Sequence, residues 1–506
     1  MEAEAQEVAG AHGGAPEGEL QARLELELPD QLPVGRGNAV FVYGHCFHPR
    51  RRVRRVRIVA DDRAIEPIAQ RMPRVDLPEY RSAFWGIVPF APTPRPRVAR
   101  LEVSAELDDG AKLRAPLAEL ELIPAAPTAP AAPAAPEGDG PLVAICMATY
   151  NPPGDLLRRQ LDSIRAQTHE RWVCVISDDH SDPERFDDLE RAVGDDPRFF
   201  VSRAPERLGF YANFERAITC APAEATHFAL CDQDDAWHPD KLEVLLAEIS
   251  EADLVYSDAR IVNEAGAVIF DTYWSRRRPN HTNLASLLIT NTITGAASLF
   301  RSELLDRALP FPTRIGAQWH DHWLALVAVA GGEVRYVDRP LYDYVQHAGA
   351  VVGHDVANPG QVGRTAGERL RMLGSDWREA VGGWCRKYFY GVCKMLLVAE
   401  VLELRCGDRL SGRRARALRW FRAIDSTPMP LGYAWLSARR LRRFAGRNET
   451  LDGEVLLLHG LAWRRILSAL TWRRSSPPRR MIKDASLPPP GGADTASADP
   501  PSPSPS

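Results

Sequence analysis

The chain has 506 residues, which is too long for one ordinary domain, and 45% of them are hydrophobic, enough for two or three buried cores. Its formal net charge of −4 gives no global reason to bind nucleic acid. The eight cysteines are scattered, mostly inside apolar runs, and form no C-x-x-C pair. We therefore expect the reduced, buried thiols of a cytosolic protein rather than zinc or disulfide chemistry.

The two ends of the chain differ in charge. The first residues, MEAEAQEVAGAHGG, are acidic and lack the basic and apolar parts of a secretory signal. No window reaches the roughly 18 uninterrupted apolar residues that a membrane span needs, so we expect a cytoplasmic protein. From Val401 to Ala485, by contrast, 19 Arg or Lys stand against 7 Asp or Glu, and this basic end is a candidate surface for anionic partners.

The N-terminal part of the chain predicts a small β domain. After residues 1–19, which we expect to be disordered, short alternating segments such as NAVFVYG and AFWGIVPF are separated by Pro, Gly and Asp over residues 20–124. This pattern is typical of a small antiparallel β-sandwich. Residues 125–140, with the run PTAPAAPAAPEGDGP, can bury nothing and predict a stiff Ala/Pro linker.

The rest of the chain predicts an α/β domain followed by helices. Over residues 141–357, continuous apolar strands alternate with amphipathic stretches, which indicates a mostly parallel sheet covered by helices on both faces. Residues 358–474 are Arg-rich with helical periodicity and predict a basic helical region. The tail from 475 to 506 is predicted to be disordered by its composition.

Polar residues follow three of the predicted strands. Tyr150 ends the run PLVAICMATY, Asp178 and Asp179 end WVCVISDD, and Asp232 to Asp235 follow THFALC. Ligands of such sheets bind beyond the carboxyl ends of the strands, so these groups should meet at one edge.

The acidic run is the most informative of these strand ends. Carboxylates crowded so closely repel one another unless solvent, a cation or a basic ligand offsets the charge. An Asp-x-Asp such as Asp232 to Asp234 can hold a hard cation, Mg²⁺ or Mn²⁺, and leave positions open for phosphates. The alternative is that Asp232 or Asp235 only caps the helix that starts near HPDKLEVLLAEI.

Seven motifs in this order resemble the family 2 glycosyltransferases with the GT-A fold. The resemblance covers Pro141 to His354, and the motifs are AICMATYN, RQLDSIRAQTHERWVCVISDDHSD, ERLGFYANFERAI, ALCDQDDAWHPDKL, TGAASLFRSEL, HDHWLALVA and YDYVQHAGAVVG. It implies a metal-dependent, inverting transferase with a Rossmann-like GT-A domain. TNTITGAASLF and YVQHAGAVVG look closest to the rhamnosyltransferase-like branch, which builds bacterial surface polysaccharides from dTDP-sugars.

Within this resemblance, the first two strand ends fall where the family binds its donor. Thr149 and Tyr150 match contacts to the nucleoside, and Asp179, with Asp178 beside it, matches a carboxylate that accepts from the base. An acidic acceptor suits the N3–H of uracil or thymine. The alternatives are ordinary strand-end packing for Thr149 and Tyr150 and turn formation for the Asp pair.

The resemblance also assigns the metal site. Asp234 matches the direct ligand, whereas Asp232 matches a contact to the ribose or to metal-bound water. His347 lies in a segment that folds over the donor in some relatives, where a histidine completes the metal shell. A lone histidine is otherwise a surface or core residue.

The resemblance assigns the base as well. A sugar hydroxyl needs a base, and Asp321 stands where the family carries its acidic base motif, with His320 in place of the common Glu. The alternative is that Asp321 caps a helix whose histidines face solvent. Gly295, in the loop Thr294-Gly295-Ala296, matches the segment beneath the donor sugar, where small residues allow a ring to approach the backbone.

The expected partners are a dTDP- or UDP-sugar, with dTDP-rhamnose as one candidate, and a glycan or lipid-linked acceptor. Peripheral contact of the Arg-rich helices with the anionic inner face of the plasma membrane is a further hypothesis. The sandwich is either a spacer or a carbohydrate-binding module, with Phe84 and Trp85 as its candidate platform.

Two other functions remain as alternatives. One is a sugar-phosphate nucleotidyltransferase, although ATYNPPGD after the first strand of the α/β domain is not the Gly-rich loop of such enzymes. The other is a non-catalytic carbohydrate-binding protein on the same fold.

Overall fold

The computed structural model describes residues 19–73, 81–124, 136–275, 279–316, 318–347, 383–426, 428, 431–432, 449–450 and 453–471. The predicted disordered tail, the predicted disordered N-terminus apart from its last residue, most of the linker and the first part of the basic helical region lie outside these residues.

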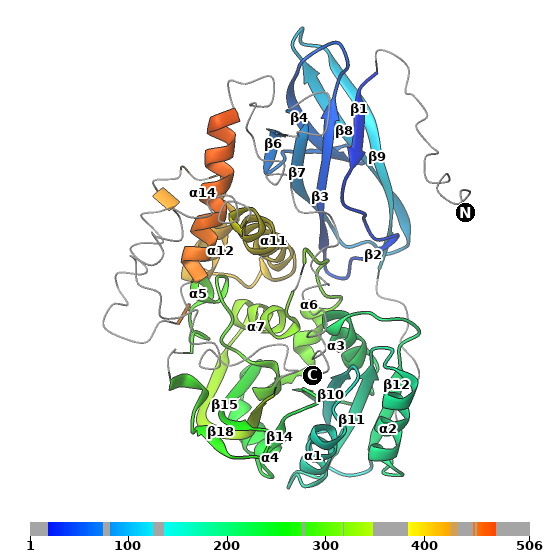
Figure 1. Cartoon of the computed structure of the whole chain (residues 1–506), viewed down its shortest axis with the longest axis vertical. Helices are drawn as coiled ribbons and strands as arrows, with labels where there is room; N and C mark the ends of the chain where they lie inside the picture. The colour runs from blue at the N-terminus through cyan, green and yellow to red at the C-terminus, as the bar shows by residue number, and fades with distance from the viewer. Residues whose placement is uncertain are drawn as a thin grey trace, which may run out of the picture.

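The N-terminal part is a sandwich of two sheets, seen at the top of Figure 1 in blue and cyan. One sheet has the order β1 (Gln21–Leu24), β3 (Asn38–Phe47), β7 (Ala83–Phe90), β6 (Ala69–Met72). The other has the order β2 (Gln31–Pro33), β9 (Lys112–Ile123), β8 (Arg97–Leu107), β4 (Val53–Ala60), β5 (Arg63–Ile65).

Strand β3 is buried on both faces because it separates two cores. Its side chains alternate, so that Val40 and Val42 point into the core between the two sheets. Phe41 and Tyr43 point the other way, into the main core of the molecule. The sandwich therefore has a second, apolar face that another part of the chain must cover.

The α/β part contains one sheet with the order β12-β11-β10-β13-β17-β15-β18-β14, and β16 pairs with β15. The bounds are β10 (Val143–Thr149), β11 (Trp172–Asp178), β12 (Phe199–Arg203), β13 (His227–Cys231), β14 (Ala236–Trp237), β15 (Leu254–Asn263), β16 (Val268–Phe270), β17 (Ser298–Arg301) and β18 (Val334–Gln346). The first four strands of this order are mutually parallel, and β17 runs antiparallel to both β13 and β15. The α/β fold class predicted from the sequence is confirmed.

Helices and short 3₁₀ turns connect and cover these strands (Figure 1). In α1 the residues Leu157, Leu161 and Ile164 recur at helical spacing and lie in the main core. The elements are α1 (Gly154–Arg165), α2 (Pro183–Val193), α3 (Phe210–Thr219), α4 (Lys241–Ile249), η1 (Tyr273–Ser275), α5 (Leu284–Leu287), η2 (Gly295–Ala297), η3 (Ser302–Leu304), α6 (Leu305–Ala308) and α7 (His320–Gly331).

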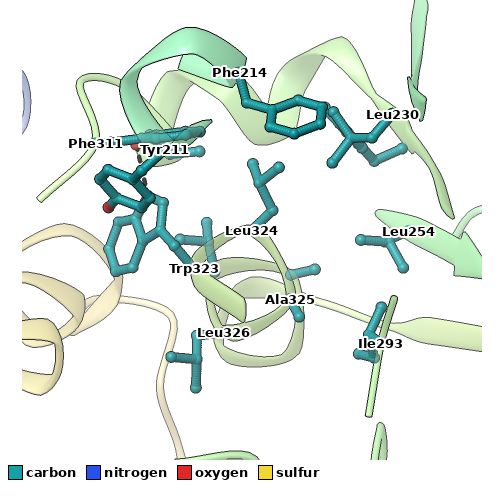
Figure 2. Close-up of a cluster of buried hydrophobic side chains, with 14 of the residues drawn as sticks. Tyr211, Phe214, Leu230, Leu254, Ile293, Phe311, Trp323, Leu324, Ala325 and Leu326 are labelled. Atoms are coloured by element: carbon teal, nitrogen blue, oxygen red, sulfur yellow. Dashed lines mark hydrogen bonds between the residues drawn. The ribbon is translucent and has the colours of Figure 1, made fainter. Parts of the chain in front are cut away.

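Helix α7 is enclosed on all sides. Every residue from Trp323 to Ala330 is buried, as expected for a helix without a polar face. Figure 2 shows its side chains among Phe214 of α3, Leu230 of β13 and Leu254 of β15. The indole nitrogen of Trp323 donates to the carbonyl of Ala308 (2.8 Å). Helix α7 is thus a rigid support for whatever its N-terminus carries.

The C-terminal helices lie beside the sandwich and next to the α/β part (Figure 1). They are the π-helical segment η4 (Tyr388–Cys393), α11 (Lys394–Cys406), α12 (Gly412–Arg422) and α14 (Gly453–Thr471). Helix α11 packs on both β3 and α7. Within the part of the chain that the structure describes, no helix combines the length and apolar character needed to cross a bilayer.

A buried polar network joins the sandwich to these helices. The indole nitrogen of Trp85 donates to the hydroxyl of Tyr388 (3.0 Å), which donates to Asp425 (2.7 Å). The Asp425 carboxylate also accepts from the guanidinium of Arg464 in α14 (2.6 Å). Phe84 and Trp85 are both fully buried, so the hypothesis that they form a carbohydrate platform is wrong.

Arg405 connects three parts of the molecule. It lies in α11, is buried, and its guanidinium donates to the carbonyl of Gly37 in the sandwich (2.6 Å). It also donates to the carbonyls of Arg307 (3.1 Å) and Ala308 (2.9 Å) in the α/β part. One side chain therefore satisfies the carbonyls of Gly37 and Arg307 and shares that of Ala308 with the indole of Trp323.

We expect Arg405→Met to lower the free energy of unfolding by about 3 kcal/mol, because each unsatisfied buried acceptor costs roughly 1–3 kcal/mol. Urea denaturation followed by tryptophan fluorescence would measure it. Arg409→Met, at an exposed position shortly after the same helix, is the matched control and should change stability by less than about 0.5 kcal/mol. Equal stability of the two variants would contradict the role of Arg405.

Candidate functional site

The predicted strand ends meet at one edge of the sheet. In the parallel register, Thr149 of β10 lies beside Asp178 of β11, and Asp178 lies beside Arg203 of β12. The hydroxyl of Thr149 donates to the Asp178 carboxylate (3.2 Å). Strand β13 pairs with β10 on its other side, so the acidic run that follows Cys231 leaves the sheet at the same edge.

Asp178 and Asp179 are both buried and both hold the chain itself. Asp178 accepts from the amide (2.9 Å) and the hydroxyl of Ser181, which is the turn that the sequence left open as an alternative. Asp179 accepts from the amides of Leu208 (2.5 Å) and Gly209 (2.9 Å), and burial raises its pKa. Gly209 has a φ of 81°, and this conformation lets its amide turn toward Asp179. The role of the pair in donor binding stays a prediction.

Two contacts that the sequence did not reveal fix Tyr150. Its amide donates to the side-chain carbonyl of Gln233 (2.9 Å), whose side-chain nitrogen donates back to the Tyr150 carbonyl (3.3 Å). The guanidinium carbon of Arg207 lies 3.9 Å from the centroid of the Tyr150 ring. The residue between the two acids of the Asp-x-Asp thus ties the ends of β10 and β13 together.

The acidic run has no capping role. Helix α4 begins at Lys241 with Asp240 as its N-cap, so neither Asp232 nor Asp235 caps it. Burial, and then the negative charges of Asp234 and Asp321, raise the pKa of Asp232 to about 7. Asp321 of α7 is therefore close enough to the acidic run for its charge to act on Asp232.

Asp235 lies behind the other two acids. It is fully buried, and one of its oxygens accepts from the amide of Val345 (3.2 Å). Its other oxygen has no hydrogen-bond partner among the described residues. Burial and the charge of Asp234 raise its pKa well above the ordinary value.

His347 contacts the acidic run, and its role as a metal ligand stays a prediction. Its Nε2 is 2.8 Å from a carboxylate oxygen of Asp234, and this hydrogen bond raises the pKa of the imidazole. The two residues are 113 positions apart in the chain. Their contact brings the end of β18 over the acidic run.

Asp321 is the second residue of α7, and Trp319 is the N-cap. The carboxylate accepts from the amide of Gly295 (3.2 Å) and from the amide of His322 (2.6 Å). Asp321 is therefore not the N-cap residue of this helix, and the alternative that it caps the helix is wrong in this respect. The N-terminus of a helix favours the ionised form of a carboxylate.

A side chain at Gly295 would fit tightly. A Cβ there would lie 3.1 Å from Nε2 of His320 and 3.2 Å from Cβ of Asp321. Its smallness therefore allows η2 to approach α7 closely. Whether the same loop also supports a donor sugar stays a prediction.

The histidines beside Asp321 do not face solvent. His320 stacks on Phe214, with ring centroids 3.6 Å apart, and burial lowers its pKa to about 3. His322 donates from Nε2 to the Leu287 carbonyl (2.6 Å), and burial lowers its pKa to about 4. Both imidazoles are therefore neutral at neutral pH, and which residue takes the proton stays a prediction.

The residues present fit a divalent cation that is bound together with a phosphate ligand. Among the described residues there is no group of three or more His, Cys, Asp or Glu that could hold a metal alone. Mg²⁺, however, is commonly bound by one or two carboxylates and completed by substrate phosphates. Asp234 offers a carboxylate and His347 an imidazole at hydrogen-bond distance, a donor pair that also suits Mn²⁺.

Residues 144–309 match the family model described as Glycosyl transferase family 2. This segment is a family 2 glycosyltransferase domain. The match contains Thr149, Asp179, Asp232, Asp234 and Gly295, whereas Asp321 and His347 follow it in the chain. The matched segment thus contains the strand ends that meet at the sheet edge. The sheet itself continues beyond the match and includes β18.

Curated relatives match part of the chain. Protein y4gI of Sinorhizobium fredii is 27% identical over 241 residues, 45% of this chain and 25% of that protein. The Methanocaldococcus jannaschii protein named uncharacterized glycosyltransferase MJ1057 is 23% identical over 197 residues, 38% and 67% of the two chains. A Bacillus subtilis protein whose name proposes a teichuronic acid biosynthesis glycosyltransferase, TuaG, is 30% identical over 117 residues, 23% and 45% of the two chains.

The chain thus spans a quarter of the first of these relatives and less than half of TuaG, so the activity of the whole protein is a proposal. Among solved structures, residues 1–349 of TarS from S. aureus give a TM-score of 0.36 at 14% identity, covering 64% of this chain and 91% of that one. A mannosyltransferase of Pyrobaculum calidifontis with GDP-Man and Mn²⁺ gives 0.33 at 16%, covering 68% and 90%. Neither likeness bears on the roles of the residues described here.

The lowered pKa of His320 predicts a specific loss of stability in acid. Its folded-state pKa of about 3 lies below the ordinary histidine value of 6.5, so between these values the unfolded chain binds the proton and stability falls as the pH falls. From pH 7 to pH 5 this one residue should cost about 2 kcal/mol.

His320→Gln cannot titrate in this range and should lose about 2 kcal/mol less than the wild type between pH 7 and pH 5. The readout is the difference between the two unfolding free energies at each pH, from urea denaturation. A difference that stays constant with pH would show that His320 is protonated in the folded protein.

Proposed function

We propose that the protein transfers a sugar from a nucleotide-diphosphate donor to a hydroxyl group of a glycan or lipid-linked acceptor, with inversion at the anomeric carbon. The observation that supports this best is the convergence of Asp232, Asp234 and Asp321. Two of these acids follow β13 and the third begins α7, and the charges of Asp234 and Asp321 act together on Asp232. These acids lie at the sheet edge of the segment that matches the family 2 glycosyltransferases, or directly follow that segment in the chain.

Asp321 is the proposed general base. Its carboxylate takes the proton of the acceptor hydroxyl while that oxygen forms a bond to the anomeric carbon. The bond from this carbon to the phosphate oxygen breaks in the same step, and the nucleotide diphosphate leaves with the electron pair. The amides of Gly295 and His322 hold the carboxylate in place, and the buried helix α7 prevents it from moving away.

Asp234 and His347, with Asp232 close by, are the residues that would hold Mg²⁺ or Mn²⁺. When bound, such a cation neutralises charge on the departing diphosphate. Asp232 is also the proposed contact to the donor ribose. The hydrogen bond between Asp234 and His347 holds these two side chains together.

Donor recognition is proposed for the ends of β10 and β11. Thr149, Tyr150, Asp178 and Asp179 would contact the nucleoside, with Asp179 accepting from the N3–H of uracil or thymine. The Asp179 oxygens already accept one amide each, and a carboxylate oxygen can accept a second donor. The resemblance to the rhamnosyltransferase-like branch makes dTDP-rhamnose the first donor to test.

We expect Asp321→Asn to lower kcat by about 10²–10⁴-fold, because general-base help is worth that much. The affinity for the donor should stay within about threefold, since the amide keeps the shape and one acceptor oxygen. Asp306→Asn, at an exposed position in α6, is the matched control and should retain activity. Near-wild-type turnover of Asp321→Asn with the true donor and acceptor would refute the assignment.

A screen of dTDP- and UDP-sugars by thermal unfolding should identify the donor. Binding to the folded state raises the apparent Tm with ligand concentration, and we expect this rise to require Mn²⁺ or Mg²⁺. Asp234→Asn should abolish the cation-dependent part, whereas Asp240→Asn, outside the cluster and paired with Arg339, should preserve it. A donor-induced shift that is equal with and without divalent cation would exclude the proposed metal role.

The proposed membrane contact involves the basic face of α12. Arg413, Arg416 and Arg419 are exposed and recur at a spacing of three, which places them on one side of the helix. We expect the protein to float with anionic vesicles, and we expect the bound fraction to fall as salt is raised, because salt screens the attraction between the arginines and the anionic lipids. Equal recovery with anionic and neutral vesicles would end this hypothesis.

A further inference from the structure

Lys241 is a charged side chain buried at the centre of the site. It is the first residue of α4 and is fully buried. Its ammonium lies 3.5 Å from the centroid of the Trp237 ring and 5.0 Å from that of Tyr342. Burial lowers its pKa to about 7, while the nearby Asp235 and Asp232 act against that shift.

The location is unusual for a lysine, since this residue type is almost never fully buried unless paired. A buried ammonium without a partner is costly, and the faces of two aromatic rings and two carboxylates offset part of that cost. Methionine or leucine would fill the same space without any such cost. A chemical reason for the charge is therefore expected in what the ammonium binds.

What it binds is the turn that carries Gly295. The ammonium of Lys241 donates a hydrogen bond to the carbonyl of Ala296, the middle residue of η2. The preceding amide, that of Gly295, donates to the carboxylate of Asp321 (3.2 Å). The hydroxyl of Ser298 secures the same turn from the other end by donating to the Gly295 carbonyl (2.7 Å).

We propose that Lys241 is a positioning residue for the reaction: by holding the Ala296 carbonyl, it fixes the turn whose Gly295 amide orients the carboxylate of Asp321. This inference rests on the proposed function, in which Asp321 is the base. In this role the side chain of Lys241 links helix α4, which follows the acidic run, to the η2 turn that contacts Asp321. Lys241 would touch neither substrate in this role.

Lys241→Met removes the donor and keeps an unbranched side chain of similar length. We expect kcat to fall on the order of tenfold, because a displaced base loses much of its advantage, while the KM for the donor at saturating cation changes less than about threefold. Lys387→Met is the control: it removes a partly buried lysine next to η4, whose ammonium lies 3.4 Å from Nδ1 of His459 in α14. It should leave kcat within about twofold.

The deciding measurement is a double-mutant cycle with Asp321→Asn. If Lys241 acts through Asp321, adding Lys241→Met to Asp321→Asn should change kcat by less than about twofold, whereas independent effects would multiply. Multiplicative effects, or an unchanged kcat for Lys241→Met, would overturn the inference. If Asp321→Asn alone retains activity, the proposed function fails first, so the two failures are distinguishable.

Ser298→Ala provides an independent route to the same turn. It removes a hydrogen bond to the Gly295 carbonyl and leaves every charge in place. Circular dichroism and the Tm establish that each variant is folded before its kinetics are compared. Should Lys241→Met not fold, the cycle of Ser298→Ala with Asp321→Asn decides: non-additive losses of kcat support control of the base through this turn, and multiplicative losses contradict it.

Discussion

Repulsion among the carboxylates after β13 is the constraint around which the site is built. Asp232, Asp234 and Asp235 leave one strand within four residues, and bringing Asp321 to the same edge adds a fourth negative charge. The protein offsets this charge with one group that closely follows the run and one from a distant segment. Lys241 lies behind the run and His347 in front of it. The folded chain thus keeps the acids together in a state in which a further positive charge is favourable.

Much of the α/β architecture could be predicted because its signals are local. Unbroken apolar runs indicated strands covered on both faces, and β10, β11 and β13 follow those runs. The rule that ligands bind at the carboxyl ends of parallel strands then selected Thr149 and the acidic run. Asp321 is a candidate only through its position in the family pattern. Composition alone would have left it as one of many acids near a helix start.

The rest depends on contacts between residues far apart in the chain. Nothing in the local sequence distinguishes Lys241 from an exposed lysine at the start of a helix. The role of Gln233 likewise becomes clear only from its hydrogen bond to Tyr150 at the end of β10. The sequence of β7 suggested a binding platform because it does not show that the C-terminal helices cover the second face of this strand. Trp85 in fact packs on Phe389, with ring centroids 5.2 Å apart.

The network from Trp85 through Tyr388 to Asp425 and Arg464 has a consequence for how the sandwich is held. Side chains packed across an interface hold the orientation of the sandwich, with Arg405 as a second anchor. Evolution is then free to lengthen, shorten or rewrite the Ala/Pro segment without turning the sandwich relative to the transferase sheet. Drift in that segment between related chains would be neutral, whereas drift at the tryptophan would not.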